Sequence, residues 1–120
     1  MSEEQLQYLL TNLVENVDGL LSTALISTEG LIVQSILEEE VSELKIAAMS
    51  ATILSTCERV LLELKQGELD ICVIQGNEGN FIIMSAGESL ILVTVLTMDA
   101  RMDICFIEMR KIANQIKKLS

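Results

Sequence analysis

The chain has 120 residues, half of them hydrophobic and 2% aromatic, and its formal net charge at pH 7 is −10. Acidic side chains outnumber basic ones by 18 to 8, so the chain matches a phosphate backbone poorly and nucleic acids are not expected partners. The sequence contains no histidine, which excludes Ser-His-Asp and Cys-His catalysis and removes the commonest metal ligand.

The chain begins with an amphipathic segment. Apolar side chains recur at three- and four-residue spacing over residues 2–17, which predicts a helix. Ser2 and Gln5 have the form of a capping box at its start. Two runs rich in β-branched residues follow at 20–28 and 31–37, and the short glycine-containing turn between them predicts a hairpin.

The longest predicted helix spans residues 42–66, with Gly67 as its C-cap, and its helical wheel has two apolar faces. The broader face is expected to lie on a sheet and consists of Ile46, Met49, Ile53, Cys57, Val60, Leu61 and Leu64. The second face is nearly opposite, has small side chains in its middle, and consists of Leu44, Ala48, Ala51, Ser55 and Leu62. Small side chains let helix backbones approach closely, so the second face predicts a seam with another helix or a partner. The alternative is an exposed Ala- and Ser-rich face that simply favours helix formation.

Three further strands are predicted at residues 69–76, 81–87 and 89–97, and a last helix at 103–119 with Asp103 as its possible N-cap. Short turns connect these strands, and short turns join antiparallel neighbours because parallel ones need long crossovers. The order of elements is α-β-β-α-β-β-β-α. We therefore predict an α/β sandwich with a five-stranded antiparallel sheet and helices on both of its faces.

No motif in the sequence indicates an active site. Gly76 and Gly79 are the nearest likeness to a phosphate loop, but they lie between two predicted strands rather than before a helix, which indicates a hairpin turn. Asp99 and Asp103 lack the third nearby oxygen ligand that a calcium site needs. The longest uncharged stretch is 46–57, with twelve residues, whereas a membrane span needs about 18.

The three cysteines, Cys57, Cys72 and Cys105, are an odd number at wide spacing without a Cys-x-x-Cys motif. This pattern favours neither a zinc site nor a disulfide framework. We expect three reduced thiols in the core, which fits a cytoplasmic location.

Several short motifs occur in a fixed order along the chain. They are ALISTEGLIV at 24–33, IAAMSA at 46–51, ERV at 58–60, GELD at 67–70 and EMRKIA at 108–113. Together they resemble the Roadblock family of dynein light chains and prokaryotic GTPase regulators, over nearly all of the chain. The family's usual Asp before the hairpin glycine is a Glu here, Glu29.

The resemblance implies a dimer in which the long central helices lie side by side and the third strands pair at the sheet edge. Family members bind Ras-like small GTPases across the dimer or serve as scaffold subunits. The bacterial gliding-motility relative activates its GTPase without donating an arginine finger. Carried to this chain, the resemblance places the dimer or partner interface at Leu44, Ala47, Ala48, Ala51, Thr52, Ser55, Arg59, Leu62, Ile71 and Val73.

From these observations we expect residues 1–120 to form one domain that acts in the cytoplasm as a homodimer, with no enzymatic activity, metal or cofactor of its own. Its partner is expected to be a small Ras-like GTPase whose GTP cycle it modulates. One alternative is a light-chain or adaptor subunit without effect on a GTPase. Another is a ligand-sensing domain with an internal pocket.

Overall fold

A computed structural model describes residues 1–119, and the eight predicted elements form in the predicted order. They are α1 (Glu3–Asn16), β1 (Leu20–Ser27), β2 (Ile32–Ile36), α2 (Glu43–Glu63), β3 (Ile71–Gln75), β4 (Gly79–Ser85), β5 (Leu90–Thr97) and α3 (Met102–Leu119). The strands of these described residues form one five-stranded antiparallel sheet, as predicted.

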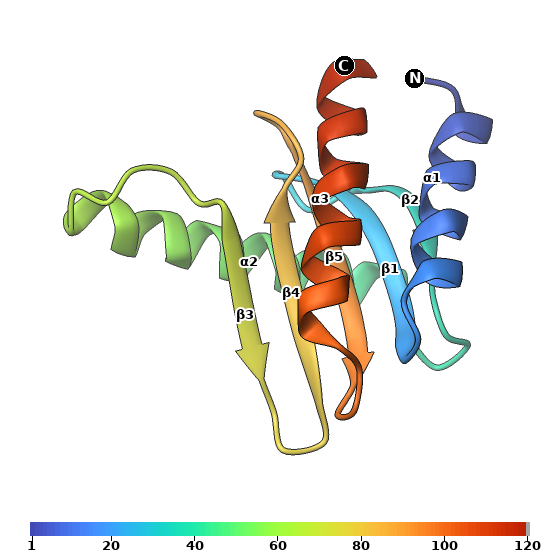
Figure 1. The fold of residues 1–120 in the computed structure, drawn as a ribbon. Coiled ribbons are helices and arrows are strands. Elements are labelled where there is room, and N and C mark those ends of the chain that lie inside the picture. The colour runs from blue at the N-terminus through green and yellow to red at the C-terminus, as the bar shows by residue number, and fades with distance from the viewer. Residues whose placement is uncertain (120) are drawn as a thin grey trace.

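The strand order across the sheet is β2-β1-β5-β4-β3, and each neighbouring pair is antiparallel. β5 is therefore the central strand with β1 and β4 beside it, and within residues 1–119 the strands β2 and β3 are the two edges. α2 follows β2 at one edge and precedes β3 at the other, so the chain must cross the sheet in this helix (Figure 1).

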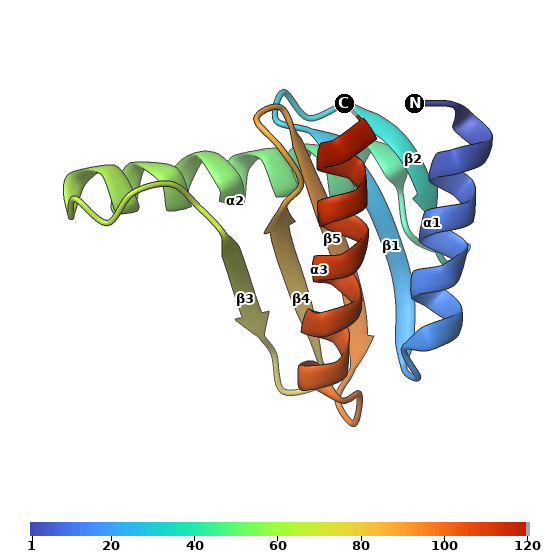
Figure 2. The same ribbon diagram turned by 45° about the horizontal axis from the view of Figure 1, so that its top comes forward.

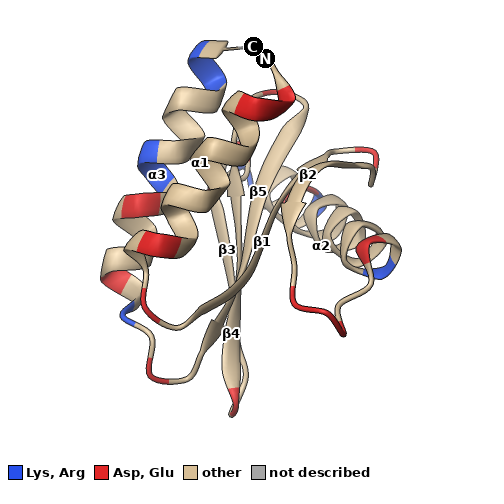
Figure 3. Cartoon of the chain, turned by 90° about the vertical axis from the view of Figure 1, so that its right-hand side faces the viewer, with Lys and Arg blue, Asp and Glu red and all other residues tan. Residues whose placement is uncertain are grey.

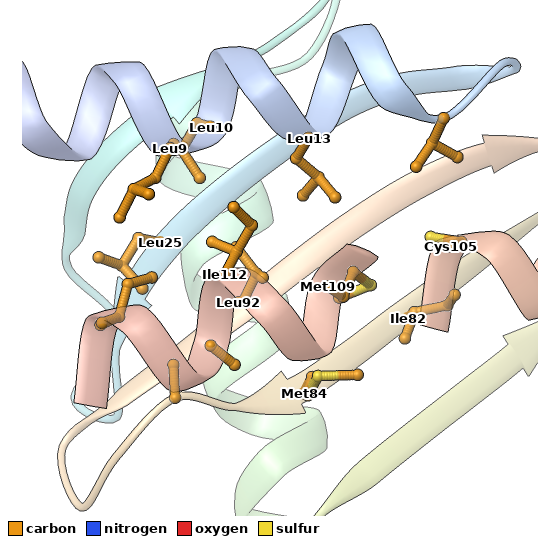
Figure 4. Close-up of a cluster of buried hydrophobic side chains, with 14 of the residues drawn as sticks. Leu9, Leu10, Leu13, Leu25, Ile82, Met84, Leu92, Cys105, Met109 and Ile112 are labelled. Carbon is orange, nitrogen blue, oxygen red and sulfur yellow. The ribbon is translucent and has the colours of Figure 1, made fainter. Parts of the chain in front are cut away.

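The helices are distributed unequally over the two faces. α1 and α3 lie side by side on one face, and α2 crosses the other (Figures 1 and 2). On the α1/α3 face the inner strands of the sheet are covered, whereas the β3 edge is partly exposed. Figure 4 shows Leu10 and Leu13 of α1, Met109 of α3, and Leu25 and Leu92 of the sheet gathered in one cluster, and all five side chains are almost completely buried.

The start of α1 is capped as predicted. The backbone N–H of Gln5 donates to Ser2 Oγ at 3.1 Å, and the Ser2 backbone N–H donates to Gln5 Oε1 at 2.9 Å. This reciprocal pair satisfies two of the amide donors that a helix N-terminus leaves unpaired.

Two predicted caps are wrong. α3 begins at Met102, and Asp103 lies in its first turn, where the carboxylate receives two hydrogen bonds from Arg101. α2 ends before Gly67, because Lys65 takes the left-handed conformation with φ of 58°. The N–H groups of Gln66 and Lys65 then donate to Leu61 O and Leu62 O, which closes a Schellman motif.

Gly19 and Gly67 both have positive φ, 87° and 90°, but differ in their surroundings. A Cβ on Gly19 would collide with Thr97 Oγ1 and lie 3.0 Å from Ala100 Cβ, whereas one on Gly67 would meet nothing within 4 Å. We predict that Gly67→Ala lowers the free energy of unfolding by about 1 kcal/mol, through backbone strain alone. Gly19→Ala is expected to lower it by about 3 kcal/mol or more, because steric overlap adds to the strain. Urea unfolding measures both free energies. Equal decreases for the two variants would contradict the prediction, because they would show that the turn after α1 shifts to accommodate the added Cβ without further cost.

Candidate partner-binding surface

α2 lies on the sheet through a face that differs in part from the predicted one. Its fully buried residues are Ile46, Ala47, Ser50 and Leu54. Met49, Val60 and Leu64, which were predicted to face the sheet, are 57%, 50% and 63% exposed. Ala47, which was predicted on the partner surface, is 2% exposed and packs inside the protomer.

The small side chains of α2 explain this rotation. A Cβ added to Gly30 in the β1–β2 turn would lie 3.3 Å from Ala51 Cβ and 3.6 Å from Ala47 O. The turn therefore packs directly against this flank of the helix, and a larger side chain at Ala51 would push it away. Close packing on the Ala47 flank turns the opposite flank, with Met49, outward.

Below α2 the sheet is only partly covered. The register places Cys72, Ile83, Val93 and Ala24 in one row across four strands, and this row is buried except at the edge residue Cys72. The next row on the same face is Ile74, Phe81 and Val95. Ile74 is 44% exposed, and Phe81 and Val95 are half-buried.

Phe81 and Val95 of this second row meet the Met49 flank of the helix in an open groove of about 450 Å³, and Ile74 continues the row beside the groove. We call Met49, Ile53, Ile74, Phe81 and Val95 the apolar shelf. Glu40 and Lys45 are the charged side chains among the described residues that line the groove. A contiguous, nearly uncharged apolar surface of this kind is typical of a protein interface.

The C-terminal part of α2 projects beyond β3, away from the rest of the sheet (Figures 1 and 2). Val60 and Leu64 continue the Met49 flank along this overhang, since they follow at helical spacing and are exposed. Half of the helix therefore presents an apolar flank that no described element of the protomer covers.

The predicted seam residues lie on the outward face of α2. Leu44 and Leu62 are 85% and 76% exposed. Ala48, Thr52, Ser55 and Arg59 are exposed between them, whereas Ala51 is half-buried against the β1–β2 turn. The Thr52 hydroxyl donates to Ala48 O at 2.9 Å, so its polar group is satisfied within the helix. We call Leu44, Ala48, Thr52, Ser55, Arg59 and Leu62 the outward face.

β3 leaves its backbone open along one edge. The N–H of Ser85 donates to Asp70 O at 2.9 Å, and the N–H of Gly76 donates to Gly79 O at 2.8 Å. In an antiparallel pair the bonded positions alternate, so the even-numbered residues of β3 bond to β4. The N–H and C=O groups of Ile71 and Val73 therefore point away from β4. The Val73 side chain is exposed, whereas the Ile71 side chain packs toward the α1/α3 face of the sheet.

An ion pair joins the start of β3 to α3. Arg110 donates from both terminal nitrogens to the two carboxylate oxygens of Asp70, each at 2.7 Å. This hydrogen bonding lowers the pKa of Asp70 and raises that of Arg110. The Asp70 side chain is 63% exposed, so the pair positions the strand more than it stabilises the fold.

Charged side chains lie mostly away from the shelf. Figure 3 shows acidic residues at the start of α1 and in the loops, and basic residues along α3. Within residues 1–119, no group of three or more His, Cys, Asp or Glu side chains is placed to hold a metal ion. None of the helices described is both long enough and apolar enough to span a membrane.

The sequence matches the family model of the Roadblock/LC7 domain over residues 6–97. The chain belongs to the Roadblock/LC7 family. An uncharacterized protein of Methanocaldococcus jannaschii is 26% identical to it over 106 residues, which cover 88% of this chain and 92% of the relative.

Two solved structures show the same fold. MglB of Myxococcus xanthus has a TM-score of 0.91 at 11% identity, with 96% of this chain and 94% of that chain covered. A second MglB structure, in a tetrameric arrangement, has a TM-score of 0.88 at 16% identity, with 98% and 88% covered. These overlaps extend beyond the family match and include most of α3.

The Asp70–Arg110 pair predicts a pH-dependent stability. Because Arg110 lowers the pKa of Asp70 in the folded state, the pair stabilises the fold above the unfolded value of 3.8 and loses this effect as pH falls through the lowered value. Asp70→Asn is expected to lower the free energy of unfolding by about 0.5 kcal/mol at pH 7, and the difference should shrink steadily as the pH falls below 3.8. Glu78→Gln in the β3–β4 turn is the control, and a difference for Asp70→Asn that does not shrink below pH 3.8 would contradict the prediction.

Proposed function

We propose that two copies of this chain form a dimer through the apolar shelf and the open edge of β3. The dimer is a non-enzymatic platform that acts in the cytoplasm, binds a small Ras-like GTPase and modulates its GTP cycle. The observation that carries the proposal is the combination, in one chain, of an uncovered apolar shelf and an apolar helix end that projects past the sheet.

These two features are complementary. A twofold axis beside β3 would lay the overhang of α2, with Val60 and Leu64, across the shelf of the other copy. The same axis would place this protomer's shelf under the partner's overhang, so one contact surface serves both copies. Self-complementary surfaces of this kind form closed twofold dimers.

The β3 edge supports the same axis. If the axis passes through Val73, the outward backbone groups of residues 71, 73 and 75 on one copy pair with those of 75, 73 and 71 on the other. This register uses all the outward groups of a five-residue strand. Pairing also removes an exposed apolar edge that would otherwise promote uncontrolled association.

The outward face of α2 is left for a different partner. The two flanks of the helix would be occupied, one by the β1–β2 turn of its own protomer and the other by the second copy. Leu44 and Leu62 would remain exposed and, with the same face of the second copy, form one continuous surface. The family resemblance and the likeness to MglB support a small GTPase as the partner that binds this surface. In this proposal the GTPase itself binds and hydrolyses the nucleotide.

The dimer predicts different outcomes for two neighbouring substitutions on α2. Met49→Glu would place a carboxylate in the apolar seam, and the dimer dissociation constant is expected to rise by at least about 1,000-fold. Ala48→Glu lies on the outward face and should leave the dimer intact. Sedimentation velocity separates twice the 13.2 kDa chain mass from the monomer.

Both positions are exposed in the protomer, so both variants should fold, and circular dichroism checks this. A dimeric Met49→Glu protein together with a monomeric Ala48→Glu protein would move the seam to the outward face. A wild-type protein that stays monomeric at micromolar concentrations would overturn the dimer.

The edge pairing is tested at Val73. Val73→Pro removes an N–H that points away from β4, so the protomer should tolerate it, as edge strands tolerate proline. The dimer should be weakened, because Val73→Pro removes two hydrogen bonds across the axis. The dissociation constant of the dimer is expected to rise by about 100-fold. Val73→Ala keeps both bonds and should change the constant by less than about tenfold. Equal effects of the two variants would show that the strands do not pair.

GTPase binding is tested by titrating the dimer into small Ras-like GTPases of the same organism, loaded with GDP or with a non-hydrolysable GTP analogue. Calorimetry measures affinity, and phosphate release measures hydrolysis. Leu62→Glu should keep the dimer and weaken binding at least about tenfold, because it replaces a large exposed apolar side chain of the proposed contact with a charge. Absence of binding in both nucleotide states would refute the GTPase assignment and favour the adaptor alternative. The sedimentation experiments test the dimer independently of this result.

A further inference from the structure

The structure brings together two of the three cysteines, which the sequence predicts as separate core residues. Cys57 of α2 and Cys72 of β3 are 15 positions apart in the chain, and their Sγ atoms are 3.7 Å apart. Both are free thiols and both are half-buried. They lie in an open apolar groove of about 420 Å³, between the helix and the edge strand.

We propose that Cys57 and Cys72 are a redox-active pair that closes reversibly into a disulfide within one chain, fastening α2 to β3. The sulfurs need to approach from 3.7 Å to the roughly 2.05 Å of the bond. The segment between the two elements, residues 64–70, contains neither helix nor strand and is mostly exposed. Cys72 also lies on an edge strand, which β4 holds from one side only in the part of the chain described. A movement of this size therefore requires no rearrangement of the core.

Thiol–disulfide exchange with a small external disulfide, such as oxidised glutathione, supplies the oxidation. One protein thiolate attacks a glutathione sulfur, forms a mixed disulfide and releases one glutathione thiolate. The second protein thiolate attacks the protein sulfur of that mixed disulfide and releases the other glutathione. The two protein thiols lose two protons and two electrons, and the external disulfide is reduced to two thiols.

Cys105 is excluded from the exchange by its position. It lies on α3, on the other face of the sheet, and is completely buried. Burial raises the pKa of Cys105 to about 11, so the reactive thiolate is scarce at neutral pH. Burial and the adjacent Cys57 sulfur also raise the pKa of Cys72, but Cys72 is half-buried and open to a small disulfide, whereas Cys105 is completely buried. Cys105 thus provides an internal reference thiol in the same molecule.

The test is to equilibrate the folded protein in mixtures of reduced and oxidised glutathione, quench with acid, alkylate free thiols after denaturation and digest without reductant. Trypsin places the three cysteines in separate peptides, 46–59, 66–101 and 102–110. We expect a linked product of the first two and an alkylated third peptide. The intact protein should lose the mass of two hydrogens, and reduced dithiothreitol should restore it.

Closing a ring of this size should raise the melting temperature by about 10 °C relative to the reduced protein. Cys105→Ala should still form the link. Cys57→Ser and Cys72→Ser, both at half-buried positions, should fold and lose both the link and the temperature shift. The proposal is overturned if both thiols remain alkylatable in oxidised glutathione alone, if the link joins two chains, or if it includes Cys105.

Discussion

A single helix must cover one face of a five-stranded sheet, and it is too narrow to do so. A helix with its side chains is about 10–12 Å wide, whereas a strand of eight residues is about 26 Å long. On the opposite face α1 and α3 share the task, and Leu25, Ile82 and Leu92 are completely buried. On the α2 face the rows with Val93 and with Ile91 are covered, and the row with Phe81 is covered only in part. The need for a second covering helix follows from this geometry alone.

The composition of α2 determines which part of the sheet it leaves open. Ala47 and Ser50 let its backbone approach the sheet closely, and Ala51 admits the β1–β2 turn against its flank. The helix is thereby held toward the end of the sheet that carries this turn. Phe81 and Val95, toward the other end, are left with Met49 beside them. The length of the helix, 21 residues, then carries its last turns past the β3 edge.

The sequence predicted local structure well. The periodicity of the apolar residues located the elements, short turns required antiparallel strands, and Ser2 with Gln5 marked the start of α1, because each of these signals lies within a few residues. The rotation of α2 about its axis was not predictable in this way. Its two apolar faces differ little in hydrophobicity, and the choice between them depends on a contact with Gly30, which lies in another element.

The functional surface could likewise be predicted only where it depends on local sequence signals. Leu44 and Leu62 were identified because a charge-poor outer face is visible on a helical wheel. Phe81 and Val95 were missed because they look like core strand residues, and only the strand order and the helix position reveal that residues 1–119 cover them only in part. Counting the rows of apolar side chains on this face could have indicated that the helix leaves part of it uncovered. A strand places up to three apolar side chains on the face, and one helix is too narrow to cover three rows. The contact between Cys57 and Cys72 depends on the same tertiary placement.

Charge distribution is consistent with assembly through the shelf. Each copy carries a formal charge of −10, so two copies repel each other wherever acidic surfaces approach. The shelf avoids this cost, because the groove beside it is lined by one acidic and one basic side chain, Glu40 and Lys45, and its remaining lining residues are uncharged. The acidic side chains at the start of α1 lie on the opposite face of the sheet. The Cys57–Cys72 pair lies at the place where α2 leaves its own sheet, so a bond there would join the helix to the strand from which the proposed dimer is built.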